Sequence, residues 1–269
     1  TCSANEPAHM SDATATARDQ EKFYSVYRGR QSALFHFAYM RTAKVKAARY
    51  LLDRNNIALR GISVLDYGFG SGTFLRACDT SCRIAGVEVD EQNVQAVRGM
   101  LAQRGFDTKD VDTLVVEHWT DHRLLASGRT YDLIVLSHVL EHLDDPTGVL
   151  QRLSQNLSAK GHIVALLPLN ERTPDPNHKW VCDRPLVERW SAQSGLPLVD
   201  YAELDHYVYW ALSAFQAPSG LGRVVGQGLS LVLGLAQAVF TPGAWFGLGK
   251  ALRVVGAKPG QIVFLLKKG

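Results

Sequence analysis

Three closely spaced glycines follow a short apolar segment and an acid in Val64-Leu65-Asp66-Tyr67-Gly68-Phe69-Gly70-Ser71-Gly72. Glycine permits positive φ and lets the backbone approach a ligand without a Cβ in the way. The pattern predicts a buried strand over 62–65 that runs into a ligand-binding loop, with helical character over 73–78. In open α/β sheets, ligands bind where a strand passes into a helix in this way.

The glycine spacing and the preceding acid narrow the choice of ligand. The order G-x-G-x-G departs from the dinucleotide fingerprint, and the absence of lysine between Lys46 and Lys109 excludes a P-loop. A carboxylate at Asp66 repels phosphates but accepts hydrogen bonds from an ammonium group. Glu88 ends the next apolar segment, 16 residues beyond Gly72, near the distance at which an acid meets ribose hydroxyls. We expect a cationic or zwitterionic ligand that carries a ribose.

From about Arg41 to Leu196 the chain resembles class I S-adenosylmethionine-dependent methyltransferases. The resemblance implies that Asp66 and the glycines surround the methionine part of the cofactor and that Glu88 holds its ribose. It also implies that Arg41, or else Arg28, contacts the cofactor carboxylate. Trp119 is expected either to stack on or edge the adenine or to serve in packing. The predicted cofactor residues are Arg41, Asp66, Gly68, Phe69, Gly70, Gly72, Glu88, Val89, Trp119 and Ser137.

A second stretch, residues 131–146, resembles the fourth strand of this family and the turn that follows it. Its Val139-Leu140-Glu141-His142 followed by Asp145-Pro146 is similar to small-molecule members, above all the O-methyltransferases of ubiquinone biosynthesis and enzymes of glycan and natural-product pathways. Methyltransferases of nucleic-acid bases or glutamine amides usually have an Asn or Asp, two prolines and an aromatic here. The resemblance therefore implies a small-molecule acceptor and disfavours nucleic acid.

The same stretch contains His138-Val139-Leu140-Glu141-His142, which matches the H-x-x-E-H pattern of inverted zincins. In that pattern two histidines share the face of a long helix and bind zinc. Here the histidines follow a buried strand and soon meet Asp144-Asp145-Pro146. We therefore favour a site without metal and keep a zinc site as the alternative. His138 is expected to line the sheet edge, whereas Glu141 and His142 are expected to stabilise the following turn.

Methyl transfer to a hydroxyl requires removal of its proton, and histidine titrates near neutral pH. The segment after the fifth predicted strand, 170–180, carries His178 between prolines and Trp180. We predict His178 as the base and His138 as the second choice, with His206 a more distant candidate.

Alternating patterns predict an α/β fold with a Rossmann-like, mostly parallel seven-stranded sheet and helices on both faces. The remaining predicted strands are 83–90, 113–116, 131–137, 161–167, 200–209 and 261–267, and the predicted helices are 91–104, 147–157 and 185–194. The expected organisation is a disordered tail over 1–20, a helical cap over 21–60, the cofactor-binding core over 61–210, an apolar insertion over 211–258 and the last strand over 259–269.

The insertion contains no ionisable residue between Val224 and Gly249. We expect a hairpin of apolar helices broken at 241–243, which serves as a lid, a dimer surface, an interfacial membrane anchor or simple packing. A single membrane span is disfavoured by its glycines and by Pro242. Of these roles, the first three favour an apolar or lipid-linked acceptor.

Composition agrees with a single enzyme domain. The 269 residues are 46% hydrophobic, and a net charge of +3 gives no sign of a polyanion partner. Four cysteines without framework spacing and the lack of an apolar leader over 1–20 favour reduced thiols in a cytoplasmic protein, with possible peripheral membrane contact. We predict methylation of a hydroxyl on a small, apolar, glycan or lipid-linked metabolite. The alternatives are N- or C-methylation and a non-catalytic cofactor-binding module that docks through its apolar insertion.

Overall fold

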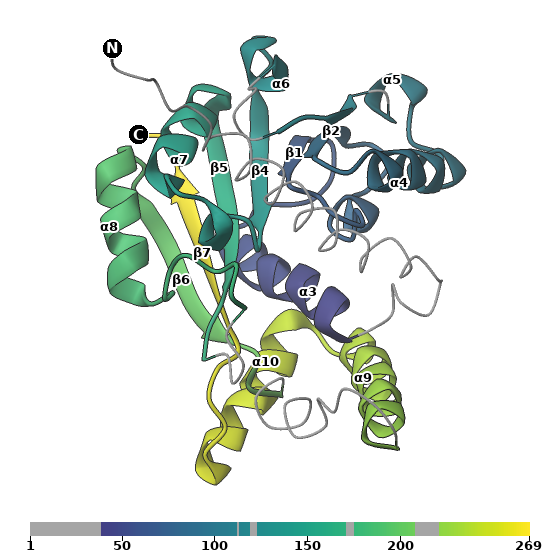
Figure 1. Cartoon of the computed structure of the whole chain (residues 1–269), viewed down its shortest axis with the longest axis vertical. Helices are drawn as coiled ribbons and strands as arrows, with labels where there is room; N and C mark the ends of the chain where they lie inside the picture. The colour runs from purple at the N-terminus through teal and green to yellow at the C-terminus, as the bar shows by residue number, and fades with distance from the viewer. Residues whose placement is uncertain (1–38, 112, 119–122, 171–174, 208–220) are drawn as a thin grey trace, which may run out of the picture.

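The computed structural model describes residues 39–111, 113–118, 123–170, 175–207 and 221–269. Its centre is a seven-stranded sheet with strand order β3-β2-β1-β4-β5-β7-β6 (Figure 1). Strands β1 to β5 pair in parallel, and β7 runs antiparallel to both β5 and β6. The strands are β1 (Ser63–Tyr67), β2 (Arg83–Glu88), β3 (Leu114–Val116), β4 (Tyr131–Ser137), β5 (Leu157–Pro168), β6 (Leu198–Leu204) and β7 (Gln261–Lys267). The predicted sheet is confirmed.

Helices cover both faces of the sheet because its central strands are apolar on both sides. Val64 and Val135 face a core beneath α3 (Tyr39–Arg54) and α4 (Glu91–Gln103). Leu65 and Ile134 face a second core beneath α7 (Pro146–Gln155) and α8 (Arg184–Ser194). The short helices are α5 (Thr108–Val111) and α6 (Arg123–Ala126).

Local sequence signals set where the helices begin. The carboxylates of Asp90, Asp145 and Asp183 each accept a hydrogen bond from the backbone N–H three residues on, at 2.8 to 3.0 Å. Such side chains satisfy one of the unpaired N–H groups at a helix start. Helix α8 ends at Gly195, whose φ of 69° is accessible to glycine without strain.

Two predicted elements differ in the structure. The helical character expected over 73–78 reduces to one 3₁₀ turn, η1 (Leu75–Ala77). Gly68, Gly70 and Gly72 all have positive φ, so the chain turns back on itself before a helix can start. The sixth strand begins at Leu198 and ends at Leu204, because Asp205 takes a φ of 67° that stops the extended chain.

The apolar insertion folds into α9 (Leu221–Val239) and α10 (Pro242–Ala251), followed by a 3₁₀ turn, η5 (Leu252–Val255). The break between the helices lies at Phe240 and Thr241, whereas the sequence placed it at 241–243, because Pro242 is suited to the first position of a helix. The Thr241 hydroxyl accepts a hydrogen bond from Ala244 N at 3.3 Å. Helix α9 lies beside α3 (Figure 1). Within the described residues, no helix combines the length and apolar character that a bilayer crossing needs.

A polar cluster beneath α10 holds the insertion to the core. The Tyr39 hydroxyl donates to Asp205 Oδ1 at 2.6 Å, and Gln261 Nε2 donates to Asp205 Oδ2 at 3.1 Å. The Trp245 indole donates to the Tyr39 hydroxyl at 3.2 Å, and its ring stacks on Tyr207 with centroids 4.3 Å apart. The beginning of α3 is thus fixed by residues that come from the other end of the chain.

Candidate active site

The glycine loop after β1 packs against its neighbours so closely that side chains would not fit at two of its glycines. A Cβ on Gly68 would lie 2.6 Å from Val139 Cγ2, and a Cβ on Gly72 would lie 2.6 Å from Val97 Cγ1. At Gly70, by contrast, a Cβ would meet nothing within 4 Å. The loop is therefore held by β4 and α4 while its middle residue faces open space.

Glu88, at the end of β2, fixes the loop from the other side. Its Oε2 accepts a hydrogen bond from Gly70 N at 2.6 Å. Its Oε1 accepts from Val89 N at 2.9 Å and from Asp90 N at 3.3 Å. Burial raises the pKa of Glu88, although these three backbone hydrogen bonds favour the ionised form. Glu88, which the sequence predicts to bind a ribose, thus also holds the backbone of the glycine loop in place.

Asp66 is the least satisfied buried polar group of the loop. Its side chain is 1% exposed, and among the described residues no hydrogen-bond donor reaches its Oδ1. Burial raises the pKa of Asp66 to about 8, and the neighbouring Glu88 adds to the shift. A buried carboxyl of this kind is stabilised when a cationic or hydrogen-bond-donating ligand arrives. Asp66 and the open space at Gly70 fit a zwitterionic ligand at this point.

Phe69 occupies a different place from the other loop residues. Its ring is buried and packs beneath β2, where a Cβ on Gly86 would lie 2.6 Å from Phe69 Cδ1. Only its backbone takes part in the loop, with the N–H bonded to Val87 O at 3.2 Å. Gly86 is therefore a packing partner of the loop that the motif alone did not reveal.

Helix α3 brings two cations to the loop. Arg41 Nη1 donates a hydrogen bond to the Ser71 hydroxyl. Lys44 lies one turn later on α3, near Glu141. Burial lowers the pKa of Lys44 to about 8, and the charge of Glu141 partly offsets this fall. Arg41 thus contacts the loop directly, and Lys44 is a second cation on the same helix that the sequence did not assign to the site.

The exit of β4 is strained at His138, which has a φ of 58°. Non-glycine residues in this region are uncommon and concentrate at functional sites. His138 Nδ1 lies 3.3 Å from Oε1 of Glu141, a carboxylate with 0% exposure. Burial lowers the pKa of His138 well below its usual value, and Lys44, His178 and His142 lower it further. His138 is therefore neutral, and within the described part of the chain its Nε2 has no hydrogen-bond partner.

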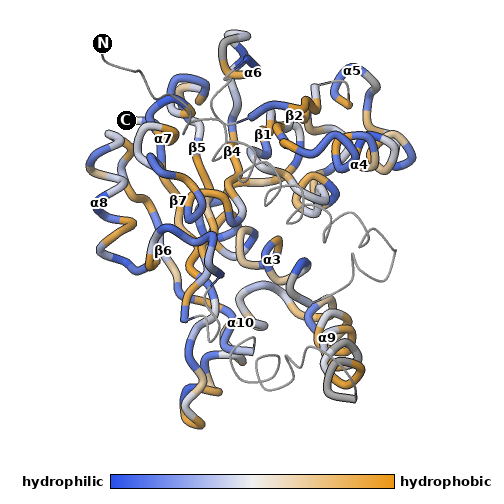
Figure 2. The backbone as a smooth tube through the Cα atoms, viewed as in Figure 1, coloured by the Kyte–Doolittle hydropathy of each residue, from blue (hydrophilic) through white to orange (hydrophobic). Residues whose placement is uncertain are grey.

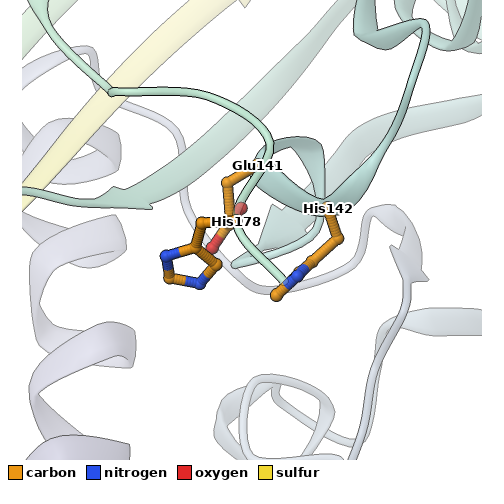
Figure 3. Close-up of side chains that lie close together, drawn as sticks. All are labelled: Glu141, His142 and His178. Carbon is orange, nitrogen blue, oxygen red and sulfur yellow. The ribbon is translucent and has the colours of Figure 1, made fainter. Parts of the chain in front are cut away.

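Glu141, His142 and His178 come together at this exit (Figure 3). The rings of His142 and His178 meet edge to face with centroids 4.8 Å apart. His142 Nδ1 lies 3.2 Å from Asn177 O, and the Glu141 carbonyl accepts from Lys179 N at 2.8 Å. Through these contacts Glu141 and His142, which the sequence predicts to stabilise the turn after β4, also hold the segment that carries His178.

The helix that an inverted zincin requires is absent from the described residues of this stretch. Leu140–His142 forms one 3₁₀ turn, so His138 and His142 do not share a helical face. One ligand atom from each of Glu141, His142 and His178 lies within 4.8 Å of the others, so these side chains could hold a divalent cation. Ligand atoms on one zinc ion at ~2.1 Å lie at most ~4.2 Å apart, so a closer arrangement would be needed.

The structure brings most of the predicted site to one edge of the sheet. Val89 and Ser137 lie at the ends of β2 and β4, beside Glu88 and His138. Trp119 and Arg28 lie outside the described residues. His206 lies apart from this cluster, bonded to Arg253 Nε at 2.8 Å. The residues that sequence reasoning did not assign to the site are Lys44, Glu141 and His142. The i, i+3 spacing of Arg41 and Lys44 was the available signal for Lys44.

Known proteins resemble this chain over its central part. A family described as a methyltransferase domain has a model that matches residues 37–208. The ubiquinone biosynthesis O-methyltransferase of Vibrio cholerae is 25% identical over 115 residues, which cover 42% of this chain and 44% of that protein. The match thus spans less than half of the relative.

Solved structures share the fold over a larger part of the chain. A 1,6-didemethyltoxoflavin N1-methyltransferase from Burkholderia thailandensis has a TM-score of 0.56 at 15% identity, covering 99% of this chain and 93% of that one. The cyclase SpnF also has a TM-score of 0.56, at 13% identity, with 83% and 80% covered. Because a cyclase shares the fold, the fold alone does not define the reaction.

Proposed function

The chain belongs to the methyltransferase-domain family, and we propose that it transfers a methyl group from S-adenosylmethionine to a hydroxyl of a small, apolar, glycan or lipid-linked metabolite. It is a small-molecule methyltransferase of class I, and the product derived from the cofactor is S-adenosylhomocysteine. The observation that carries the proposed oxygen chemistry is the meeting of His178, His142 and Glu141 (Figure 3), two of which follow Val139, the residue against which Gly68 of the glycine loop packs.

The residues of the loop fit the two polar ends of the cofactor. Asp66 offers a buried carboxylate to the ammonium group, and Arg41 offers a guanidinium to the carboxylate. Glu88 holds the loop and lies where a ribose would be received. When bound, S-adenosylmethionine supplies a methyl group that is already electrophilic, because it is carried on a sulfonium.

The protein must then hold the acceptor oxygen and take up its proton. His178 is proposed as the base: the proton leaves the hydroxyl for a ring nitrogen as the oxygen gains the methyl group. His142 packs against His178, and its contact with Asn177 O keeps the segment in place. Buried Glu141 would stabilise the imidazolium that results. His138, which is neutral, is the second candidate for this role.

Two features support an apolar hydroxyl acceptor. The Vibrio relative is described as an O-methyltransferase of ubiquinone biosynthesis. In addition, the insertion at 221–255 places apolar helices next to α3, which carries Arg41 and Lys44. N-methylation is the closest alternative, since the toxoflavin-type neighbour methylates nitrogen by its description.

Calorimetric titration with S-adenosylmethionine and S-adenosylhomocysteine, followed by turnover assays on hydroxyl- and amine-bearing apolar acceptors, tests the proposal. We expect micromolar cofactor binding and turnover of hydroxyl acceptors. Turnover of amines alone would replace oxygen by nitrogen as the target. Cofactor binding with no turnover of either acceptor class would favour a non-catalytic module.

A further inference from the structure

Helix α9 carries an apolar stripe on its solvent side. Val225, Val232, Leu235 and Val239 are 42%, 60%, 56% and 84% exposed. Together with Gly228 they follow steps of three and four residues, which places them on one face of the helix. Phe240, directly after the helix, is 42% exposed.

The opposite face of α9 is already occupied. Ser230 Oγ accepts a hydrogen bond from Tyr39 N at 3.1 Å, and Gln237 Nε2 donates to the Thr42 hydroxyl. Leu233 and Ala236 pack against the core beneath α3. The helix is therefore docked on the protein by one side, and the exposed side chains of the stripe lie on the other. Figure 2 shows that α9 is hydrophobic along much of its length.

The charged residues of the insertion itself have one sign. Residues 221–258 contain four Lys and Arg residues and no Asp or Glu. The nearby acid is Glu203 on β6, whose charge acts on His206 together with Lys250 and Arg253. Lys250, Arg253 and Lys258 are exposed, and they alternate with the exposed apolar side chains of Leu248, Val254 and Val255. Figure 1 shows α9 and α10 in the same lower part of the molecule, away from α5 and α6.

An apolar helix face in a segment whose own charged residues are all cations is the pattern of a helix that lies in a membrane interface. We propose that α9, α10 and η5 dock this protein on the surface of an anionic lipid membrane, with the α9 stripe inserted among the lipids. The cations of α10 and of the segment after it then face the lipid phosphates. A second copy of the chain offers the same cations and therefore lacks this charge complementarity.

Membrane docking would explain why an enzyme site for a small molecule is bordered by an exposed apolar helix pair. The helices contact α3, so an acceptor that partitions into lipid would reach the protein next to the active-site cations. The docking inference itself does not depend on the acceptor proposed above, because binding to vesicles is measured without turnover.

The test is sedimentation of the full chain with vesicles of phosphatidylcholine alone and of phosphatidylcholine with phosphatidylglycerol. We expect about tenfold or greater preference for the anionic vesicles, reduced by added salt. Val232→Asp and Leu235→Asp should each weaken binding by about tenfold or more. Lys250→Glu and Lys258→Glu should reduce only the preference for anionic lipid.

The matched control is Val181→Asp, which changes an equally apolar side chain of 91% exposure outside the stripe. It should bind vesicles as the native chain does. Circular dichroism and titration with S-adenosylmethionine verify that each variant is folded. Equal vesicle binding by native and Leu235→Asp proteins would overturn the proposal, as would a native protein without affinity for anionic vesicles. A dimer in analytical ultracentrifugation that Leu235→Asp abolishes would assign the stripe to a second copy and also overturn it.

Discussion

The backbone N–H of Gly70 donates a hydrogen bond of 2.6 Å to Oε2 of Glu88. This bond joins the loop after β1 to the end of β2, so the two sequence motifs of the cofactor site form one structural unit. The second carboxylate oxygen is engaged by Val89 and Asp90. Changes at Glu88 should therefore affect the shape of the loop as well as any contact with the ribose.

Replacing Glu88 should weaken cofactor binding in a graded manner. Glu88→Gln retains one acceptor oxygen and Glu88→Ala retains none, so the loss should be larger for alanine, about 1.5–3 kcal/mol or roughly 10–100-fold. Calorimetry with S-adenosylhomocysteine measures it. Glu188→Gln, at an exposed ion pair on α8, is the control and should bind normally. Normal binding by Glu88→Ala would show that the assigned site is wrong.

Asp66→Asn should weaken the cofactor while stabilising the ligand-free protein at higher pH. The folded pKa of about 8 exceeds the usual pKa of ~3.9, so the folded state binds more protons between these values. Stability conferred by the protonated carboxyl is therefore lost as pH rises from ~4 to ~8. The asparagine variant has no carboxyl at this position, so its stability does not fall for this reason as the pH rises.

Urea unfolding of the native and Asp66→Asn proteins at pH 5 and at pH 8 measures this difference. The variant should gain about 1–3 kcal/mol relative to the native protein at the higher pH. Its affinity for S-adenosylmethionine should fall by about 10–100-fold, since the buried carboxylate no longer meets the ammonium group. A variant with unchanged affinity would remove Asp66 from the site.

Alanine at two glycines should have different consequences. Both Gly70→Ala and Gly72→Ala place a side chain at positive φ, which costs ~1 kcal/mol each. Only Gly72→Ala also meets Val97, and overpacking adds ~1–3 kcal/mol. Gly70→Ala should melt at the higher temperature of the two yet bind cofactor poorly, because its Cβ enters the open space at the loop. Tight cofactor binding by folded Gly70→Ala would place the ligand elsewhere.

His178→Ala should lower kcat by about 10²–10⁴-fold and leave cofactor affinity nearly unchanged. The reason is that His178 is assigned to the acceptor proton, whereas Asp66 and Glu88 are assigned to the cofactor. Steady-state kinetics with a hydroxyl acceptor and calorimetry with S-adenosylhomocysteine measure the two effects. His162→Ala changes a histidine within β5 and should retain activity. An unchanged kcat in His178→Ala would transfer the role to His138.

Chelation should leave turnover unchanged. Lys44 supplies a positive charge near Glu141, and the ligand atoms of Glu141, His142 and His178 must move closer before one ion can bridge them. Metal analysis of the purified protein and assays with and without EDTA measure this. Stoichiometric metal that is lost in Glu141→Gln, together with activity lost to EDTA, would instead identify these side chains as a metal centre.

The sequence by itself determined the sheet and one half of the site. Apolar runs bounded by glycine and aspartate marked where the strands and helices begin. The bounds of β7 agree with the prediction, because its continuous apolar run is clearly set off from the polar residues beside it. The cofactor loop was also readable, since Asp66, the glycines and Glu88 lie within two consecutive strand ends. Their chemistry depends mainly on local backbone geometry.

The tertiary structure alone decided the other half. Glu141 and His142 belong to one turn and His178 to a segment beyond β5, and only the packing of the folded chain brings them together. Burial, which no local pattern reports, sets the low pKa of His138 and Lys44. Likewise, the insertion was recognisable as apolar, but only its docking on α3 showed which face remains exposed. Contacts between residues distant in sequence depend on the packing of the whole chain, and for that reason they could not be derived from spacing.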